Sequence, residues 1–484
     1  MKQLSQILSA ITPRAFTATA DCEIRALQYD SRKVEAGDCF FAIRGTQSDG
    51  HDYIDKAIEQ GAVAIVCEKM PEKVVDGVSY IEVEDSNAAM ADIAAAFYDN
   101  PSRQLSLVGV TGTNGKTTIA TLLYDLYQGM GYKVGLISTV VYRIGDREVD
   151  STHTTPDTIR LNAMLREMVD IGCDYCFMEV SSHSVVQERI RGLKFRGAIF
   201  TNLTHDHLDY HGTFAEYIKA KKRLFDSLDK RAFALTNCDD RNGEVMVQNC
   251  RAQVSRYSLR QMADFRCKIL ETHFDGMLLK IENNEVWVNF LGRFNASNLM
   301  AVYGAARLLG AEEQELLQGL STLHSVSGRF EPVRSEDGKV AIVDYAHTPD
   351  ALENVITTIN DIRGEGQRLI VVCGCGGDRD ATKRPEMAAI ASREADIAIL
   401  TSDNPRTEDP EKILDQMMEG VDSSAQVLRI TDRRQAIRTA VMLARKGDII
   451  LVAGKGHENY QIIGREKLHF DDREELRAAF SANK

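Results

Sequence analysis

A glycine-rich segment of the chain has the residue types and spacing for binding phosphates. It reads Thr111-Gly112-Thr113-Asn114-Gly115-Lys116-Thr117-Thr118, and it follows the apolar run Leu105–Val110 and precedes a helical pattern from Ile119 to about Met130. Backbone amides of such a loop can surround phosphate oxygens, Lys116 can reach the terminal phosphates, and the Thr117 hydroxyl can bind Mg²⁺. The strict motif has Gly where this chain has Val110, so an ordinary glycine-rich turn is the alternative. The order of strand, loop and helix favours a nucleotide site.

A second segment is dense in possible metal ligands. It reads Thr204-His205-Asp206-His207-Leu208-Asp209-Tyr210-His211. One hypothesis is a zinc site, because the segment resembles the H-x-H-x-D-H run of metallo-β-lactamase-like hydrolases, although its last His arrives one residue late. The other is Mg²⁺, because the chain also has a phosphate loop and because oxygen ligands such as Glu179 suit Mg²⁺ better than Zn²⁺. We expect Mg²⁺.

Lys221 occupies a position where the sequence pattern predicts an apolar residue. Phe214, Ile218, Phe225 and Leu228 share one stripe of a predicted helix, and position 221 completes that stripe. A lysine in an apolar stripe is unfavourable unless it reaches solvent, pairs with an acid or loses its charge. The spacing alone leaves these alternatives open.

The elements that position these residues follow an alternating pattern of strands and helices, which predicts an α/β fold with largely parallel sheets. In such sheets, ligands bind where loops leave the carboxyl ends of the strands. Turn signals at Asp99-Asn100-Pro101 and Phe330-Glu331-Pro332 divide the chain into units 1–100, 101–329 and 330–484. The predicted strands are Asp38–Ile43, Val63–Cys67, Leu105–Val110, Val340–Val343, Leu369–Val372, Ile397–Leu400 and Ile449–Val452.

Composition excludes several classes of protein. The formal net charge of −13 has the wrong sign for a protein whose main partner is nucleic acid. No run approaches the ~20 apolar residues of a membrane helix, and no signal peptide is evident, so we expect a cytoplasmic protein without a membrane partner. The ten cysteines are scattered, and the pairs Cys173/Cys176 and Cys373/Cys375 lie in strand-like segments, which indicates reduced thiols.

Six motifs occur in order along nearly the whole chain. They are the phosphate loop, Glu179-Val180-Ser181-Ser182-His183, Asn202-Leu203-Thr204-His205-Asp206-His207-Leu208-Asp209, Gly292-Arg293-Phe294-Asn295, Asp344-Tyr345-Ala346-His347 and Gly454-Lys455-Gly456-His457-Glu458. Together they resemble the motifs of the Mur ligases, the ATP-dependent amide-forming enzymes of peptidoglycan synthesis. In such enzymes ATP phosphorylates a substrate carboxylate, and an amine then attacks the acyl phosphate.

The resemblance implies a three-domain architecture. Residues 1–100 would bind a UDP-sugar, 101–329 would form a central P-loop ATPase, and 330–484 would form a Rossmann-like domain that binds the amino acid. It also implies that CO₂ carbamylates Lys221 to N6-carboxylysine. That modification would turn a buried cation into a metal-binding carbamate.

The resemblance further assigns roles to individual residues. Thr117 and Glu179 would hold one Mg²⁺, and His207 and carbamylated Lys221 would hold a second, with Lys116 completing the catalytic set. Asn295, Arg329 and Asp344 would contact the adenine and ribose of ATP. The UDP-sugar peptide would contact Ser31, Thr46, Gln47, Ser48, Thr154, Thr155, Ser181, Gln187 and Arg189. Taken singly, these Ser and Thr residues could equally form turns or caps.

The segment Asp403-Asn404-Pro405-Arg406 matches the signature of relatives that add meso-diaminopimelate. A guanidinium binds a carboxylate through two parallel hydrogen bonds, so Arg406 suits the distal carboxylate of diaminopimelate and would repel the ammonium of lysine. By resemblance, Arg379, Gly454 and Glu458 complete this pocket. The alternative is that Arg406 pairs with Glu408 or Asp409 on its own loop.

We therefore expect a monomeric enzyme that uses ATP and two Mg²⁺ ions to add meso-diaminopimelate to UDP-N-acetylmuramoyl-L-alanyl-D-glutamate. Its partners would be small molecules alone. The alternatives are the same ligation with L-lysine, a folylpolyglutamate synthetase-like ligase, and a zinc hydrolase. We also expect Lys116, Arg189, Arg379 and Arg406 to form local positive clusters, because the chain as a whole is acidic.

Overall fold

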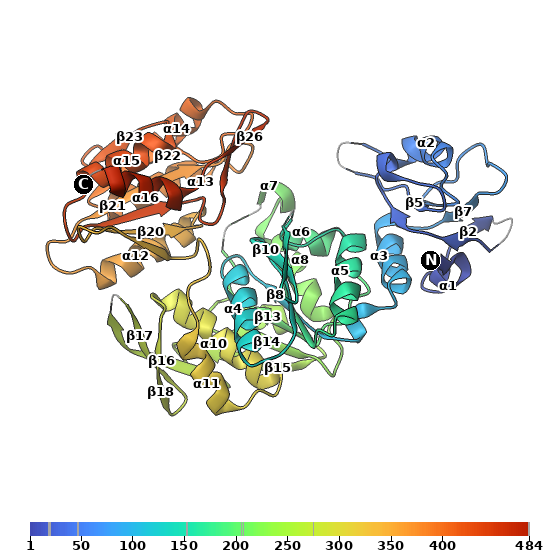
Figure 1. The fold of residues 1–484 in the computed structure, drawn as a ribbon, viewed down its shortest axis with the longest axis horizontal. Coiled ribbons are helices and arrows are strands. Elements are labelled where there is room, and N and C mark those ends of the chain that lie inside the picture. The colour runs from blue at the N-terminus through green and yellow to red at the C-terminus, as the bar shows by residue number, and fades with distance from the viewer. Residues whose placement is uncertain are drawn as a thin grey trace.

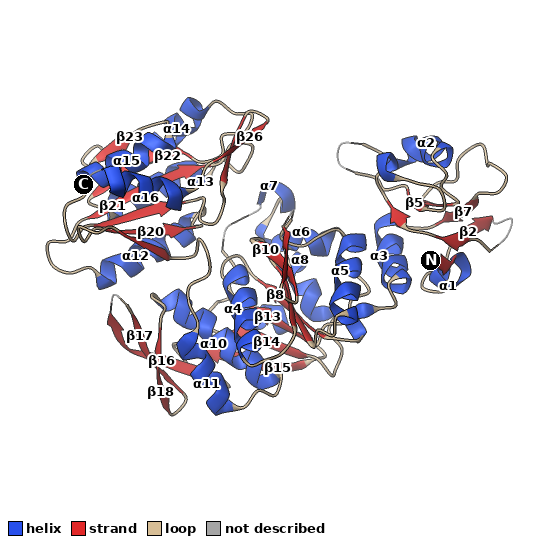
Figure 2. Ribbon diagram, viewed as in Figure 1, coloured by secondary structure: helices blue, strands red, loops and turns tan. Residues whose placement is uncertain are grey.

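The computed structural model describes residues 1–17, 21–45, 48–151, 153–204, 206, 208–273 and 275–482. Three large sheets follow one another along the chain, and Figure 1 shows them as three bodies in a row with the N-terminal sheet at one end. Helices cover the sheets in Figure 2, as the predicted α/β class requires. No helix within the described ranges is long and apolar enough to span a bilayer.

The N-terminal sheet has the strand order β2-β7-β6-β5-β4, and only its β2–β7 pair is antiparallel. The predicted strands near residues 40 and 65 are confirmed as β5 and β6. Helix α3 leaves this sheet, begins at the side-chain cap Asp85, and packs against α5 of the next body. The elements are β1 (Lys2–Gln3), α1 (Leu4–Leu8), β2 (Ala15–Thr17), β3 (Glu23–Ile24), β4 (Leu27–Gln28), β5 (Cys39–Phe41), α2 (Ile54–Glu59), β6 (Ala64–Cys67), β7 (Ser79–Glu82) and α3 (Ser86–Phe97).

The central sheet is larger and more mixed than the sequence predicted. Its order is β11-β10-β9-β12-β8-β13-β14-β15-β16-β17-β18. Parallel pairing is confined to the middle of this order, in the run β9-β12-β8-β13-β14-β15-β16. Antiparallel hairpins extend both edges, because the short turns Gly145-Asp146 and Glu282-Asn283 reverse the chain directly between paired strands. Positive φ angles at Gly145 and Glu282 fit such turns.

Two predicted elements of the central body are confirmed: the strand near residue 108 is β8, and the helix that follows the phosphate loop is α4. The elements are β8 (Ser106–Thr111), α4 (Lys116–Gly129), β9 (Val134–Ile137), β10 (Val141–Ile144), β11 (Arg147–Asp150), α5 (Thr158–Asp170), β12 (Tyr175–Glu179), α6 (Ser182–Val186), β13 (Gly197–Phe200), α7 (Leu208–His211), α8 (Phe214–Asp226), β14 (Phe233–Asn237), α9 (Gly243–Val247), β15 (Gln253–Ser258), β16 (Phe265–His273), β17 (Gly276–Ile281), β18 (Asn284–Val288), α10 (Arg293–Leu308) and α11 (Glu313–Thr322).

Alternate residues of the central strands face two separate cores. On β8, Val108 and Val110 pack with α4, α10 and α11, whereas Leu107 packs with α5 and α8 on the other face. This double burial explains why the strand reads as a continuous apolar run. The phosphate loop follows β8 directly, so it lies at the carboxyl edge of the sheet and leads into the first turn of α4.

The C-terminal sheet has the order β19-β20-β24-β21-β22-β23 and is parallel except for β19. Its four predicted strands are confirmed as β20, β21, β22 and β24, and all ten cysteines of the chain are free thiols, as expected. The elements are β19 (Glu331–Arg334), β20 (Val340–Asp344), α12 (Pro349–Ile362), β21 (Leu369–Cys375), α13 (Lys383–Glu394), β22 (Ile397–Ser402), α14 (Pro410–Met418), β23 (Val427–Arg429), α15 (Arg433–Leu443), β24 (Ile449–Ala453), β25 (Tyr460–Ile463), β26 (Glu466–His469) and α16 (Asp472–Ala482).

Candidate functional site

Three adjoining cavities lie where loops leave the carboxyl ends of strands in the central and C-terminal sheets. Their volumes are about 310, 400 and 280 Å³, and we call them the first, second and third cavity. Arg329 and Tyr345 line both the first and the second, and Tyr345, His347 and Arg379 line both the second and the third. The three spaces therefore form one connected run.

The first cavity brings together the residues that the sequence assigned to a nucleotide base and ribose. Asn295, Arg329 and Asp344 all line it, with Gly115 and Asn114 from the phosphate loop. It also contains Arg293, which lies in the motif Gly292-Arg293-Phe294-Asn295 but was given no role. Sequence reasoning missed five further residues, because no local pattern marks them: Asn237, Tyr257, Asn298, Asp350 and Asn354. Two sheets thus contribute to one cavity.

Asp344 ends β20 as a buried carboxylate inside this first cavity. Its Oδ2 accepts a hydrogen bond of 2.7 Å from the Phe330 amide. Burial raises the pKa of Asp344 to about 6, although the nearby Arg329 guanidinium acts in the opposite direction. The group therefore titrates close to neutral pH.

The phosphate loop is fixed by the segment that follows β13. Asn202 Oδ1 accepts from the Asn114 amide at 2.9 Å, and the Thr201 hydroxyl donates to the Asn114 carbonyl at 2.6 Å. A Cβ at Gly112 would lie 1.8 Å from Thr201 Oγ1, so only glycine fits there. Lys116 donates to the carbonyls of Gly112 and Thr113 at 3.0 and 2.8 Å, so its ammonium folds back onto the phosphate loop itself.

The candidate metal ligands Thr117, Glu179 and Lys221 line the second cavity together, beside Lys116. Glu179 is buried, and its two oxygens accept from the Thr139 amide at 2.7 Å and from the Thr139 hydroxyl at 3.2 Å. The Thr117 hydroxyl accepts from Arg329 at 3.1 Å. A hydroxyl and a carboxylate are hard oxygen donors, so this set fits Mg²⁺.

Lys221 does not extend to solvent, so that alternative is wrong. Its side chain is 1% exposed, and its Nζ donates to the Gly112 carbonyl at 2.7 Å. Burial, and then the neighbouring Lys116, lower the pKa of Lys221 well below its usual range. A neutral amine at this position can react as a nucleophile.

His205 and His207 lie outside the described residues, so the structure places neither of them. In the part of the chain that is described, no three His, Cys, Asp or Glu side chains form a cluster that could hold a metal. The assignment of His207 as a ligand stays a prediction.

Five residues assigned to the UDP-sugar peptide form one wall of the second cavity: Thr154, Thr155, Ser181, Gln187 and Arg189. Arg189 is held in place, because it donates to the Thr155 carbonyl at 2.6 Å and to Gln187 Oε1 at 2.6 and 3.0 Å. The Ser181 hydroxyl accepts from the Ser184 amide, so it also caps α6, as the alternative proposed.

The residues of the N-terminal body that were assigned to the UDP-sugar and that the structure describes do not line the second cavity. Ser31 is buried in a short 3₁₀ turn, and Ser48 lies on the N-terminal body outside the three cavities, while Thr46 and Gln47 fall outside the described residues. Tyr29, two residues before Ser31, has its pKa raised by burial and then by the charge of Asp157, whereas Arg189 of the second cavity acts in the opposite direction.

The third cavity contains most of the residues assigned to an amino acid: Arg379, Asp403, Asn404, Arg406, Gly454 and Glu458. Pro405 does not line it, and its carbonyl would instead lie 1.9 Å from a Cβ at Gly377, which explains the glycine there. Asp380 and Lys383 also line the cavity and were missed.

Arg406 is held by two neighbouring segments. Its Nη1 donates to the Gly377 carbonyl at 2.7 Å, and its backbone pairs with the hairpin β25–β26 through Ile462 and Gly464. The alternative pairing within its own loop is wrong in the described structure, because Glu408 accepts from Arg384 at 2.9 Å and Asp409 caps α14.

His347 lies where the second and third cavities meet. Burial, and then Lys383, lower its pKa to about 4, so the ring is neutral at physiological pH. Nδ1 lies 2.9 Å from the Tyr345 carbonyl, which fixes the proton on Nδ1 and leaves Nε2 as an acceptor.

Comparisons with known proteins agree along the whole chain. Three family models match: "Mur ligase family, catalytic domain" at residues 23–98, "Mur ligase middle domain" at 110–306, and "Mur ligase, glutamate ligase domain" at 328–456. Over 480 residues the chain is 56% identical to a UDP-N-acetylmuramoyl-L-alanyl-D-glutamate–2,6-diaminopimelate ligase of Bacteroides thetaiotaomicron, covering 99% of this chain and 100% of that one.

Two further relatives carry the same name. The ligase of Bacteroides fragilis is 56% identical over 481 residues, covering 99% of both chains. A solved structure is 35% identical, has a TM-score of 0.67 and covers 95% of both chains. The middle-domain match covers both the phosphate loop and the segment 204–211, which favours a Mur ligase over the zinc hydrolase. The chain therefore belongs to the Mur ligase family.

Proposed function

We propose that this protein joins meso-diaminopimelate to UDP-N-acetylmuramoyl-L-alanyl-D-glutamate with hydrolysis of ATP to ADP and phosphate. One observation carries the proposal: the three cavities connect, so that a nucleotide loop, a wall for a carboxylate substrate and an amino-acid pocket containing Arg406 open into one another. The whole-length identity to ligases named for this reaction supports the same substrates.

ATP would occupy the first cavity. Asn295, Arg329 and Asp344 would contact the adenosine, and the amides of residues 112–118 would surround the phosphates. Lys116 would move from the carbonyls of its own loop to the terminal phosphate oxygens, where its charge opposes the charge of the transferred group.

The hard oxygen ligands in the second cavity would hold Mg²⁺. Thr117 and Glu179 would bind one ion, and His207 and carbamylated Lys221 would bind a second; when bound, these ions neutralise phosphate charge. The low pKa of Lys221 supports the carbamate, because only the neutral amine reacts with CO₂.

The UDP-linked dipeptide would lie between the N-terminal body and the second cavity. Ser31, Thr46, Gln47 and Ser48 would contact the UDP-sugar, and the wall of Thr154, Thr155, Ser181, Gln187 and Arg189 would orient the terminal carboxylate toward the phosphate loop. In this proposal residues 1–100, 101–329 and 330–484 act as the UDP-sugar, ATP and amino-acid domains.

Diaminopimelate would occupy the third cavity among Arg379, Asp403, Asn404, Pro405, Arg406, Gly454 and Glu458. Arg406 would bind its distal carboxylate, and the attacking amine would reach the acyl phosphate through the junction beside His347. All partners in this reaction are small molecules. We propose a cytoplasmic monomer that acts in peptidoglycan precursor synthesis.

The test is a complete reaction with purified protein, ATP, Mg²⁺, the UDP-linked dipeptide and diaminopimelate. We expect ADP, phosphate and the amide product in equal amounts by chromatography and mass spectrometry, with no product when any one substrate is omitted. Product formation only with a folate and glutamate would support the folylpolyglutamate synthetase alternative. ATP hydrolysis without an amide product would contradict the proposal.

A further inference from the structure

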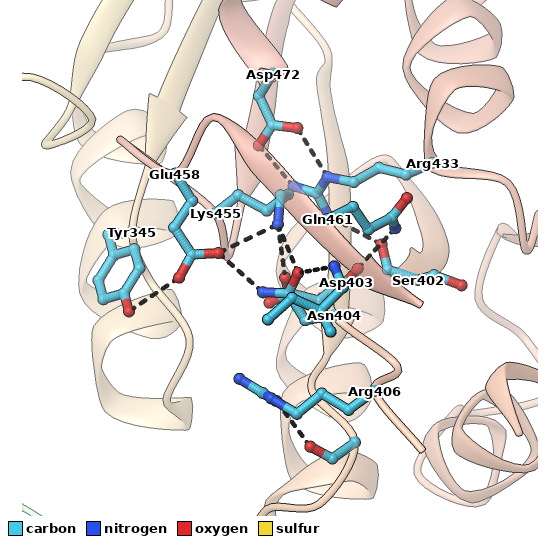
Figure 3. Close-up of polar contacts among 12 residues, drawn as sticks. Tyr345, Ser402, Asp403, Asn404, Arg406, Arg433, Lys455, Glu458, Gln461 and Asp472 are labelled. Carbon is cyan, nitrogen blue, oxygen red and sulfur yellow. Dashed lines mark hydrogen bonds and ion pairs between the residues drawn. The ribbon is translucent and has the colours of Figure 1, made fainter. Parts of the chain in front are cut away.

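Lys455 is a buried cation directly behind the third cavity. Its side chain has no exposed surface, and its Nζ donates to Asn404 Oδ1 at 3.1 Å, Glu458 Oε2 at 3.2 Å and Asp403 Oδ1 at 3.5 Å. All three partners line the cavity, and Figure 3 shows the ammonium among them. A buried ammonium is unfavourable unless its partners stay in place, so the group fixes these side chains.

The contacts of Lys455 also set the orientation of the Asn404 amide. Oδ1 of Asn404 accepts from both Lys455 and the Ile462 amide, the latter at 2.9 Å. Nδ2 therefore faces Glu458 Oε2, to which it donates at 2.9 Å. The other oxygen of Glu458 accepts from the Tyr345 hydroxyl at 3.4 Å, as Figure 3 shows. Lys455 is thus the one group among these contacts that binds all three side chains directly.

Charge balance gives the cluster a preferred ligand. Asp403 and Glu458 share one ammonium, so one negative charge remains to face the cavity. Burial and then the Asp403 carboxylate raise the pKa of Glu458, whereas Lys455 and the Asn404 amide act in the opposite direction, so Lys455 opposes protonation of this carboxylate. The remaining negative charge can bind one ammonium group of a ligand. Arg406, which lines the same cavity, can bind a carboxylate on the same end of that ligand.

We propose that Lys455 is a positioning residue for the amino-acid substrate, because it holds Asp403, Asn404 and Glu458 in the arrangement that receives a zwitterionic end with one ammonium and one carboxylate. Lys455 acts through these neighbours and does not touch the substrate. This inference rests on the proposed function, since it specifies how the third cavity recognises its ligand.

A separate contact holds the strand ends, so a Lys455 variant tests the side chains and not the backbone. Arg433 is fully buried and pairs with Asp472 at 2.8 Å. Its guanidinium donates to the Ala453 carbonyl at 3.0 Å and to the Ser402 carbonyl at 3.4 Å, at the ends of β24 and β22 (Figure 3). None of these contacts involves Lys455, so we expect them to remain when Lys455 is replaced.

The test compares Lys455→Met with Lys467→Met. Both ammonium groups lie over the Tyr460 ring, at 5.5 and 3.8 Å, but Lys467 is exposed and makes no contact with the cluster in the described structure. We expect Lys455→Met to raise the KM for diaminopimelate about tenfold, with the KM values for ATP and for the UDP-linked dipeptide within about twofold of the parent. Lys467→Met should leave all three unchanged.

A charge-balanced pair covers the case in which Lys455→Met does not fold. Glu458→Gln and the double variant Lys455→Met/Glu458→Gln differ only at Lys455, and we expect about a threefold difference in KM, confined to diaminopimelate. An equal rise in the KM of all three substrates, or no rise for diaminopimelate, would overturn the positioning role while leaving the proposed function intact. Parent enzyme that does not use diaminopimelate at all would overturn both.

Discussion

Arg406 lies on the third cavity with a guanidinium that donates one hydrogen bond to the Gly377 carbonyl. Replacing it removes the charge that would bind a distal carboxylate and leaves that carboxylate in the cavity unpaired. We expect Arg406→Ala to raise the KM for diaminopimelate about a hundredfold, while the KM for ATP stays unchanged. Steady-state phosphate release measures both.

Arg438→Ala is the matched control, because Arg438 is exposed on α15 of the same body. It should behave like the parent enzyme. An Arg406→Ala enzyme with a parental KM for diaminopimelate would refute the assignment of this arginine to substrate recognition.

Lys221 offers a prediction about dissolved CO₂. Its pKa is lowered well below the usual range by burial and then by Lys116, which favours the neutral amine, the form that reacts with CO₂. We expect removal of CO₂ from enzyme and buffers to lower the turnover rate at least about tenfold, and bicarbonate to restore it.

Labelled bicarbonate followed by NMR spectroscopy would detect the carbamate directly. Lys221→Arg should show neither the signal nor the recovery, because a guanidinium stays protonated. A parent enzyme whose rate is indifferent to CO₂, with no carbamate signal, would leave Lys221 as an unmodified buried amine.

The raised pKa of Asp344 leads us to expect that nucleotide binding depends on pH. Its pKa is raised to about 6 by burial, so the carboxylate is ionised above that pH and gains a proton as the pH falls through it. We expect the KM for ATP of Asp344→Asn to exceed that of the parent about tenfold near pH 8, and the ratio to approach one near pH 5. Taking the ratio cancels the titration of ATP itself.

Individual side chains differed in how far the sequence could place them. Lys221 stood out because it interrupts an apolar stripe, and the structure buries it at that position. Asn237 at the end of β14 and Asp350 in the first turn of α12 reach the first cavity with no local pattern to mark them. Sequence periodicity reports which face of an element a residue occupies, whereas a shared cavity depends on how whole bodies pack.

The phosphate loop is the element whose geometry is most restrictive. A Cβ at Gly112 would lie 1.8 Å from Thr201 Oγ1 and 3.0 Å from the Asn202 carbonyl, so Gly112→Ala must displace the loop from the segment after β13. We expect ATP turnover to fall at least about a hundredfold, while the unfolding temperature changes little because the loop is small.

Gly129→Ala, at the other end of the helix that the loop begins, is the control for a glycine substitution. A Cβ at Gly129 meets nothing within 4 Å, so we expect parental activity and equal or slightly higher stability. Normal turnover by Gly112→Ala would mean that the loop does not bind phosphates in this conformation.

The strands were the elements best predicted from the sequence. Runs such as Leu369–Val372 and Ile449–Val452 are apolar throughout because both faces of the C-terminal sheet are covered by helices. The antiparallel hairpins β10–β11 and β16–β18 were missed, because their strands mix exposed polar and buried residues and lie at the edge of the sheet. Edge strands carry a weaker apolar signal than central ones.

The whole molecule brings distant segments to one connected site. Asn114 of the phosphate loop donates to Asp350 of α12 at 2.9 Å, and Arg329 spans from Thr117 to the Tyr345 ring, which lies 4.6 Å away. These contacts tie the central body to the C-terminal body. The acidic chain still gathers Lys116, Arg189 and Arg379 around the second cavity, which suits anionic substrates.

The central claim is that this connected site makes an amide bond to diaminopimelate and selects it over lysine. The most direct measurement is phosphate release from ATP with UDP-N-acetylmuramoyl-L-alanyl-D-glutamate, with kcat/KM determined for meso-diaminopimelate and for L-lysine under the same conditions. We predict a preference for diaminopimelate of at least about a hundredfold, because Arg406 attracts its distal carboxylate and repels the lysine ammonium. Equal kcat/KM values, or a preference for L-lysine, would contradict this account.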